Sequence, residues 1–280
     1  MKPSLTPPSR ILGLDFSGAA DAGRAIWLAE GRAEADGLRV TDCRPAEALP
    51  GGGTAREPAL AALRQYLSAL GHYAIGMDFP FSLHRSLVPE GSLAEFLAAF
   101  PGRYATPEIF REACRKVTGV GSERVLKRRC DLEARTPFAP HNLRVYRQTW
   151  YGITALLAPL SVGGARILPV QKPEEKSPSQ KPWLLETCPA SALKAAGRCV
   201  PYKGRTIAHR AGREAIVDWL EAGGVSWGNG VRRSALLDDA GGDALDSVIC
   251  AWIAWRAVSD PGRLFPAPGP EQRVEGYVYF

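Results

Sequence analysis

The pattern of apolar and polar residues in the first part of the chain predicts three short strands. Residues 11–15 (ILGLD) are an apolar run, short enough for a buried strand, that ends in a carboxylate before a turn. Residues 24–30 predict a second strand, and residues 37–43 alternate as expected for a strand with one face in water. Glycine-containing turns separate the segments, which predicts an antiparallel meander.

A helical period and two further apolar runs follow the meander. Leucines spaced by three and four positions predict a helix over residues 57–70. Apolar runs at 74–78 and 183–187 predict a fourth and a fifth strand. Apolar residues recur with the helical period from Leu245 onward, so the last clear helix is expected over residues 239–258. The tail at 276–280 is expected either to add a short strand or to pack against the body. The order predicts an α/β fold, with a mixed five-stranded sheet flanked by helices.

The segment between the fourth and fifth strands changes in character. From residue 81 to about residue 168 the pattern is helical and positively charged, which predicts a large insertion after the fourth strand. A chain of 280 residues can bury a sizeable core, so we expect a single domain over residues 1–280 that contains this insertion.

Basic residues are dense in one part of the insertion. They are Arg124, Lys127, Arg128, Arg129, Arg135, Arg144 and Arg147. One interpretation is a solvated helix surface, which a dense basic run often is. The other is a surface that binds the phosphates of a nucleic acid. On this second interpretation, further contacts come from Arg103, Tyr104, Tyr202 and Lys203.

Composition narrows the class of protein. Lys and Arg exceed Asp and Glu by 35 − 29 = 6, which is compatible with a polyanionic partner. The sequence contains no run of ~18 apolar residues, so it predicts no transmembrane helix. The first ten residues lack the apolar segment of a secretory signal. We therefore expect a cytoplasmic protein with no membrane partner.

Cysteine and histidine spacing does not predict a zinc site. The six cysteines contain no C-x-x-C pair, and the four histidines show no H-x-x-x-H spacing. A disulfide framework is not expected in a chain of this size, so the thiols are interpreted as buried or idle groups.

Five carboxylates stand out by their position. Asp15, Asp78 and Glu186 lie at or near the ends of predicted strands. Asp243 and Asp246 are three residues apart at the start of the last helix and share a face. Each acid has a structural explanation when taken alone, such as a turn cap, a wet strand residue or a partner of the helix dipole. Together they predict one site, because ligands of open α/β sheets bind beyond the carboxyl ends of the strands.

A group of carboxylates repels itself, and a divalent cation relieves that repulsion. Oxygen ligands suit Mg²⁺ or Mn²⁺, and two ions about 4 Å apart activate a water and stabilise the leaving oxygen of a phosphodiester. In this scheme Asp15 bridges both ions, while Asp78 and Glu186 complete the coordination shells. Asp246, with Asp243, holds the ion that binds the attacking water.

Four motifs resemble those of an uncharacterised domain-of-unknown-function family that is described as predicted nucleases with a ribonuclease H-like fold. They are GLDFSG at 13–18, GMDFP at 76–80, LETCP at 185–189 and DALDS at 243–247. The last one also looks like the terminal acidic helix of Holliday-junction resolvases of the ribonuclease H-like superfamily, where D-x-x-D contributes metal ligands.

The resemblance implies both a fold and a set of metal ligands. The superfamily core has three antiparallel strands, a helix, a parallel fourth strand and then alternating helices and strands. The same resemblance implies metal-ligand positions for Asp15, Asp78 and Asp246. The place of Glu186 in the LETCP motif adds it to the catalytic acids.

The leading hypothesis is therefore a metal-dependent nuclease that hydrolyses phosphodiester bonds by a two-metal-ion mechanism. One alternative is a non-catalytic module that binds nucleic acid by charge, although an acidic cluster without metal would be costly to bury. Another is a phosphotransferase of the actin-like or sugar-kinase type, whose first strand also ends in an aspartate and a turn. For that class, the glycines at 51–53 and 163–164 are poor substitutes for phosphate-binding hairpins.

Overall fold

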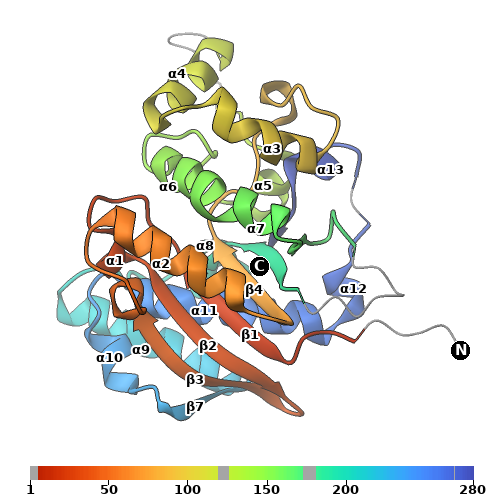
Figure 1. Cartoon of the computed structure of the whole chain (residues 1–280). Coiled ribbons are helices and arrows are strands. Elements are labelled where there is room, and N and C mark those ends of the chain that lie inside the picture. The colour runs from red at the N-terminus through yellow and green to blue at the C-terminus, as the bar shows by residue number, and fades with distance from the viewer. Residues whose placement is uncertain (1–5, 119–125, 173–180, 268) are drawn as a thin grey trace, which may run out of the picture.

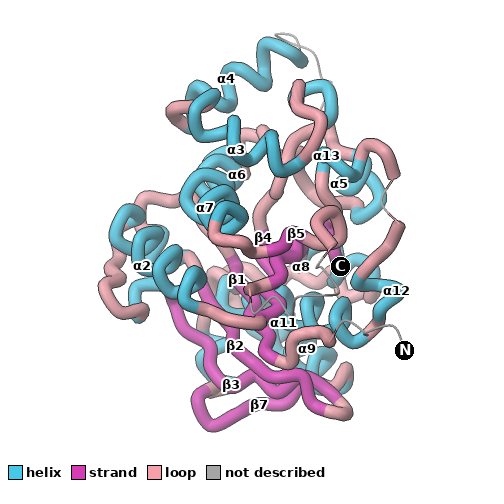
Figure 2. Tube along the Cα trace, turned by 45° about the vertical axis from the view of Figure 1, so that its right-hand side comes forward, coloured by secondary structure: helices cyan, strands magenta, loops and turns pink. Residues whose placement is uncertain are grey.

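The computed structural model describes residues 6–118, 126–172, 181–267 and 269–280. These residues form an eight-stranded mixed sheet flanked by helices, which confirms the predicted α/β class (Figures 1 and 2). The strands are β1 (Arg10–Asp15), β2 (Trp27–Glu34), β3 (Gly37–Pro45), β4 (Tyr73–Asp78), β5 (Arg166–Ile167), β6 (Trp183–Thr187), β7 (Val225–Gly230) and β8 (Val278–Tyr279).

The sheet order is β5-β6-β4-β1-β2-β3-β7, and β8 pairs with β6. The first three strands form the predicted antiparallel meander. On the other side of β1, β4 and then β6 run parallel to it. The carboxyl ends of β1, β4 and β6 therefore lie at the same edge of the sheet.

The sheet has eight strands where five were expected. The two-residue strands β5 and β8 are too short to carry a polarity pattern. Of the two alternatives expected for the tail, a short strand or packing against the body, the structure has the strand, β8. In β7, Gly228 and Gly230 hide the pattern, because the backbone of Thr41 on β3 passes close to both. The second strand begins at Trp27 and not at residue 24, since Ala22–Ala25 form a short helix, α1.

Helices cover both faces of the sheet. The helix after the meander is α2 (Arg56–Ala69), within one residue of its predicted ends. In Figure 1, α2 lies in front of the sheet and five later helices lie behind it. These five are α8 (Pro189–Ala195), α9 (Ile207–Ala222), α10 (Arg233–Asp238), α11 (Asp243–Ser259) and α12 (Pro261–Leu264). The short helix α13 (Gln272–Glu275) lies beside α3 and α5 of the insertion instead.

The insertion is helical, as its sequence pattern predicts, and stands beyond the end of β4 (Figure 1). It contains α3 (Leu93–Arg103), α4 (Pro107–Thr118), α5 (Arg129–Ala134), α6 (Tyr146–Tyr151), a π-helical turn (Gly152–Leu157) and α7 (Ala158–Val162). Nowhere in the described part of the chain is a helix both long and apolar enough to span a membrane.

The pleat of the central strands divides the core between the two faces. Leu12 and Leu14 of β1 pack in the core that includes the leucines of α2. Ile11 of β1 and Ala74 of β4 pack in the other core, with α11. The odd-numbered residues of β1 and the even-numbered residues of β4 therefore face α11.

Two glycines on that face let α11 lie directly on the sheet. A Cβ atom at Gly13 would lie 1.9 Å from the carbonyl oxygen of Ser247, and one at Gly76 would lie 2.5 Å from that of Cys250. Both oxygens belong to the backbone of α11, so neither can move without moving the helix. Glycine at these two positions therefore sets the distance between α11 and the centre of the sheet.

The variant Gly13→Ala should be destabilised by about 3 kcal/mol, because the new methyl group forces α11 away from β1. Chemical denaturation of the metal-free protein measures the difference. The matched control is Gly102→Ala in α3, where no atom lies within 4 Å of the added Cβ. A loss of stability as large in the control would contradict the assigned role of Gly13.

Candidate functional site

Four of the five predicted acids meet where α11 crosses the ends of β1 and β4. Asp15 and Asp78 are directly paired in the parallel register of these strands, and both lie on the face that carries Gly13 and Gly76. Asp243 and Asp246 lie in the first turn of α11. We call Asp15, Asp78, Asp243 and Asp246 the acid cluster. The predicted convergence of these four residues is thus present.

Burial and mutual repulsion disfavour the charged forms of these acids. Asp15 and Asp246 are 7% and 2% exposed. Burial, followed by the charge of Asp246, raises the pKa of Asp15 well above its ordinary value. The same two causes raise the pKa of Asp78 to about 7, and burial raises that of Asp243 to about 6. Lys203 acts in the opposite direction on all three acids, but its single positive charge does not offset burial and repulsion.

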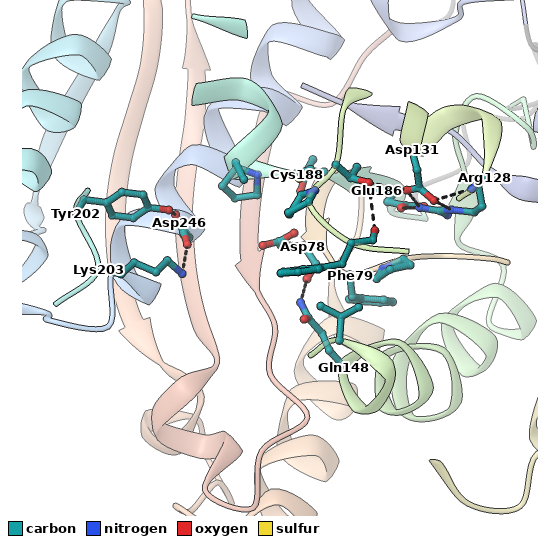
Figure 3. Close-up of a pocket in the computed structure, with 18 residues that line it drawn as sticks. Asp78, Phe79, Arg128, Asp131, Gln148, Glu186, Cys188, Tyr202, Lys203 and Asp246 are labelled. Carbon is teal, nitrogen blue, oxygen red and sulfur yellow. Dashed lines mark hydrogen bonds and ion pairs between the residues drawn. The ribbon is translucent and has the colours of Figure 1, made fainter. Parts of the chain in front are cut away.

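Tyr202 and Lys203 contact the cluster from the loop between α8 and α9 (Figure 3). The Tyr202 hydroxyl donates to Oδ1 of Asp246 at 2.8 Å, and Nζ of Lys203 lies 2.6 Å from Oδ2. Buried Arg213 on α9 holds this loop by donating to the carbonyl oxygens of Tyr202 and Gly204. Both side chains that were expected to contact phosphate are thus turned toward Asp246.

Glu186 is not in the acid cluster, contrary to the prediction. Its neighbours Trp183 and Leu185 pack with α11, whereas Leu184 packs in the opposite core. The alternation of β6 therefore turns Glu186 away from the face that carries Asp15 and Asp78. There the Glu186 carboxylate accepts a hydrogen bond of 3.0 Å from the backbone N–H of Phe81.

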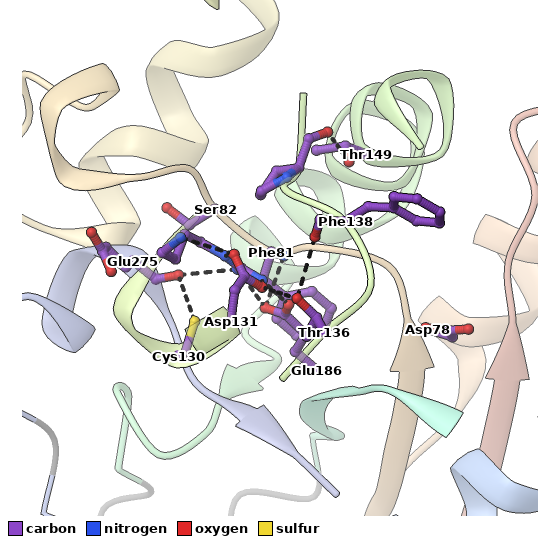
Figure 4. A network of polar contacts seen from close by, with 12 residues as sticks. Asp78, Phe81, Ser82, Cys130, Asp131, Thr136, Phe138, Thr149, Glu186 and Glu275 are labelled. Carbon is purple, nitrogen blue, oxygen red and sulfur yellow. Dashed lines mark hydrogen bonds and ion pairs between the residues drawn. The ribbon is translucent and has the colours of Figure 1, made fainter. Parts of the chain in front are cut away.

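Glu186 instead belongs to a buried ion-pair network (Figure 4). Arg128 is fully buried and donates to both carboxylate oxygens of Glu186 and to both of Asp131. A further Arg128 bond, of 3.1 Å, reaches the carbonyl oxygen of Glu275 near the C-terminus. Arg128 therefore joins the insertion to the sheet and to the tail. The predicted contact of Arg128 with a phosphate at the surface is wrong, because its guanidinium is buried and bonded to these partners.

The remaining basic residues of the insertion differ in exposure. Arg129, Arg135, Arg144 and Arg147 are exposed, and Arg124 lies outside the described residues. Arg129 pairs with Glu133, Arg147 with Glu108, and Lys127 donates to the carbonyl oxygen of Thr136. Two other residues that were expected to contact nucleic acid have partners within the protein. Arg103 pairs with Glu90, and Tyr104 is buried against Phe100 and Phe110.

A cavity of about 310 Å³ joins the acid cluster to the Arg128 network (Figure 3). Asp78, Asp246 and Lys203 line one end, and Arg128, Asp131 and Glu186 line the other. As the side chains stand, no three His, Cys, Asp or Glu residues of the described chain are grouped to hold a metal ion. The carboxylates of the acid cluster are suitable ligands for a metal ion, but the ammonium group of Lys203 occupies the space next to Asp246.

Sequence reasoning missed the Arg128 network and the walls of the cavity. Arg128 and Asp131 are spaced as helical neighbours, but Glu186 lies 58 residues from Arg128 and no local signal links them. Gln148 of α6 donates to the carbonyl oxygen of Asp78, and no motif or spacing in the sequence indicates this contact either.

The raised pKa of Asp78 predicts how the metal-free protein responds to pH. The folded state holds this proton up to about pH 7, whereas the unfolded chain releases it near the ordinary pKa of 3.8. Between these values the folded state binds more protons, so the free energy of unfolding falls as pH rises. Thermal melting should show that the wild type loses about 2 kcal/mol more than Asp78→Asn between about pH 5 and pH 8. Equal losses in the two proteins would contradict this.

The variant Glu186→Gln should lose about 3 kcal/mol of stability, because Arg128 keeps its charge in a buried site with one anion fewer. Its affinity for Mn²⁺ should not change, since Glu186 lies outside the acid cluster. Denaturation and calorimetry measure the two quantities. The control Glu108→Gln breaks an exposed ion pair with Arg147 and should change stability little. A loss of Mn²⁺ binding in Glu186→Gln would make this residue a metal ligand after all.

Comparison with known proteins agrees with the family that the motifs resemble. A family model described as "Protein of unknown function (DUF429)" matches residues 13–273, a range that contains all four motifs. Neither the curated proteins nor the solved structures contain a significant match. From its first acidic strand to its last helices, this chain belongs to the DUF429 family.

Proposed function

We propose that the protein is a metal-dependent nuclease that hydrolyses phosphodiester bonds of nucleic acids. The observation that carries the proposal is the acid cluster: four carboxyl groups from β1, β4 and α11 share one site, and Lys203 contacts two of them. So much negative charge beside a cavity is costly for a structural role. It is the donor set that a divalent-cation phosphodiesterase requires.

We further propose that the fold is of the ribonuclease H-like type. The strands β1, β2 and β3 form an antiparallel meander, followed by α2 and by β4 parallel to β1. The helix that carries the last acids packs across the centre of the sheet. This arrangement supports the proposal because it is the chain order expected for the core of that superfamily.

The residues of the acid cluster fit Mg²⁺ or Mn²⁺. Both ions prefer carboxylate oxygens and keep several waters, and the cluster offers carboxylates with Asp243 partly open to solvent. The raised pKa values of Asp15 and Asp78 support this fit, because burial and the charge of Asp246 disfavour their ionised forms and a bound cation would favour them. Asp15, Asp78 and Asp246 would hold the metal, and Asp243 would contribute from the rim.

Bound metal would supply a water nucleophile near neutral pH and stabilise the leaving oxygen. The chain's own residues prepare the site for this. The Tyr202 hydroxyl fixes the rotamer of Asp246 through its hydrogen bond. Lys203 offsets part of the negative charge of the cluster in the free protein and, once released from Asp246, would lie within reach of a phosphate oxygen. Exposed Arg144 and Arg147 are placed to bind flanking phosphates.

The first test is metal-dependent cleavage. We expect the wild type to cleave single-stranded or structured DNA or RNA with Mg²⁺ or Mn²⁺. The variants Asp15→Asn and Asp246→Asn should lose at least about 100-fold in rate, because each removes a charged ligand. The matched control is Asp218→Asn on α9, an exposed acid paired with Arg233. Absence of cleavage of all these substrates by the wild type would overturn the proposal.

A second test uses metal binding alone. Lys203→Met should bind Mn²⁺ about 10-fold more tightly than the wild type, since the ammonium group competes with the cation for Asp246. Isothermal titration calorimetry measures the affinities. The control Lys116→Met lies on α4, away from the sheet edge, and should leave the affinity unchanged. Equal or weaker binding by Lys203→Met would remove Lys203 from the site.

A further inference from the structure

We propose that the cavity beside the acid cluster receives one unpaired nucleobase of the strand being cut, stacked on Phe138. This inference rests on the proposed nuclease function and deepens it by naming the substrate class. A strand that is single, frayed or flipped out at the scissile position can enter, whereas an intact duplex cannot.

The size and position of the cavity limit its occupant. Its volume of about 310 Å³ is at the lower end of the range for small-molecule pockets, which is room for a nucleoside but not for a base pair with its backbones. One end is formed by Asp78 and Asp246, where the scissile phosphate would lie. Since a base is joined to its phosphate through a single sugar, a strand held at the acids reaches the cavity with the adjacent base.

The walls of the cavity are suited to a flat apolar surface. Phe79, Pro137, Phe138 and Val145 line it. Phe138 is half-buried, and its backbone is held by the Thr136 hydroxyl, which donates to its carbonyl oxygen. The Arg144 guanidinium lies 5.5 Å from the Phe138 ring. In Figure 4 the ring points away from the Arg128 network, on the side of Asp78. An aromatic side chain held in this way is a stacking platform for a base.

The charges of the cavity favour a neutral occupant over a phosphate. Arg128 lies at the inner end, but its guanidinium is already bonded to Asp131 and Glu186. Lys203 at the outer end is bonded to Asp246. At the inner end the single cation Arg128 thus faces the two carboxylates of Asp131 and Glu186, so a phosphate group placed there would meet excess negative charge. A nucleobase carries no charge and can use the N–H groups of its edge as donors to the carboxylates.

The neighbouring surface agrees with a single strand as the substrate. Exposed Arg144 lies in the loop that carries Phe138, and exposed Arg147 lies just after it in α6. They are therefore placed to bind the phosphates on one side of a strand whose base is inserted. Stacking of a base with cationic contacts to its backbone is the common design of proteins that bind single-stranded nucleic acid.

The test measures equilibrium binding in the Asp15→Asn background, where cleavage should be at least about 100-fold slower. Fluorescence anisotropy compares a labelled single-stranded oligonucleotide with a blunt duplex of the same sequence, in the presence of Mn²⁺. We expect the single strand to bind at least about 10-fold more tightly. Adding Phe138→Ala should weaken single-strand binding about 10-fold, and Phe138→Trp should restore it, because the larger ring also stacks. The matched control is Leu143→Ala, an exposed residue of the same loop that does not line the cavity.

The outcomes separate this inference from the proposed function. Equal binding of duplex and single strand, or unchanged binding by Phe138→Ala, overturns the base pocket while cleavage by the wild type keeps the nuclease proposal. Binding that depends on Phe138 without any cleavage by the wild type keeps the pocket and overturns the nuclease. A Phe138→Ala protein that fails to fold leaves the decision to Phe138→Trp and to an oligonucleotide with an abasic site, which should bind the folded parent about 10-fold more weakly.

Discussion

The direct contact between the backbone of α11 and the centre of the sheet is the constraint on which the site depends. Gly13 and Gly76 carry no side chain, so the carbonyl oxygens of Ser247 and Cys250 approach the two central strands closely. Each glycine lies two residues before an aspartate and on the same face of its strand. The close packing therefore holds the first turn of α11, with Asp243 and Asp246, against Asp15 and Asp78.

Two groups of buried acids result from this geometry, and they differ in how their charge is balanced. Glu186 and Asp131 share Arg128, whose guanidinium bonds to all four of their oxygens. Such a network is satisfied internally and stabilises one arrangement of the chain. Among the cations of the described residues, Lys203 pairs with the acid cluster, and the pKa values of Asp15 and Asp78 are raised all the same. Charge left uncompensated in a cavity is typical of a functional site.

The insertion completes the site without supplying any of its acids. Arg128 ties the insertion to β6 and to the tail through Glu186 and the carbonyl oxygen of Glu275. Gln148 of α6 binds the carbonyl oxygen of Asp78 at the end of β4. These contacts hold the loop of Phe138 over the sheet edge and close one side of the cavity. The sheet and α11 thus provide the acids of the cluster, and the insertion provides walls that select what reaches them.

The sequence by itself determined the strands of the meander and the class of fold. It also determined four acids that meet, out of the five that were predicted to do so. These depend on local patterns, because an apolar run that ends in an acid and a helix with acids three residues apart each place their carboxylates by backbone geometry alone. Only the tertiary structure decided the face on which Glu186 lies, because that depends on the register between β4 and β6. It also decided that Arg128 is buried and that Lys203 contacts Asp246, since the partners of a long cationic side chain come from segments far apart in the chain.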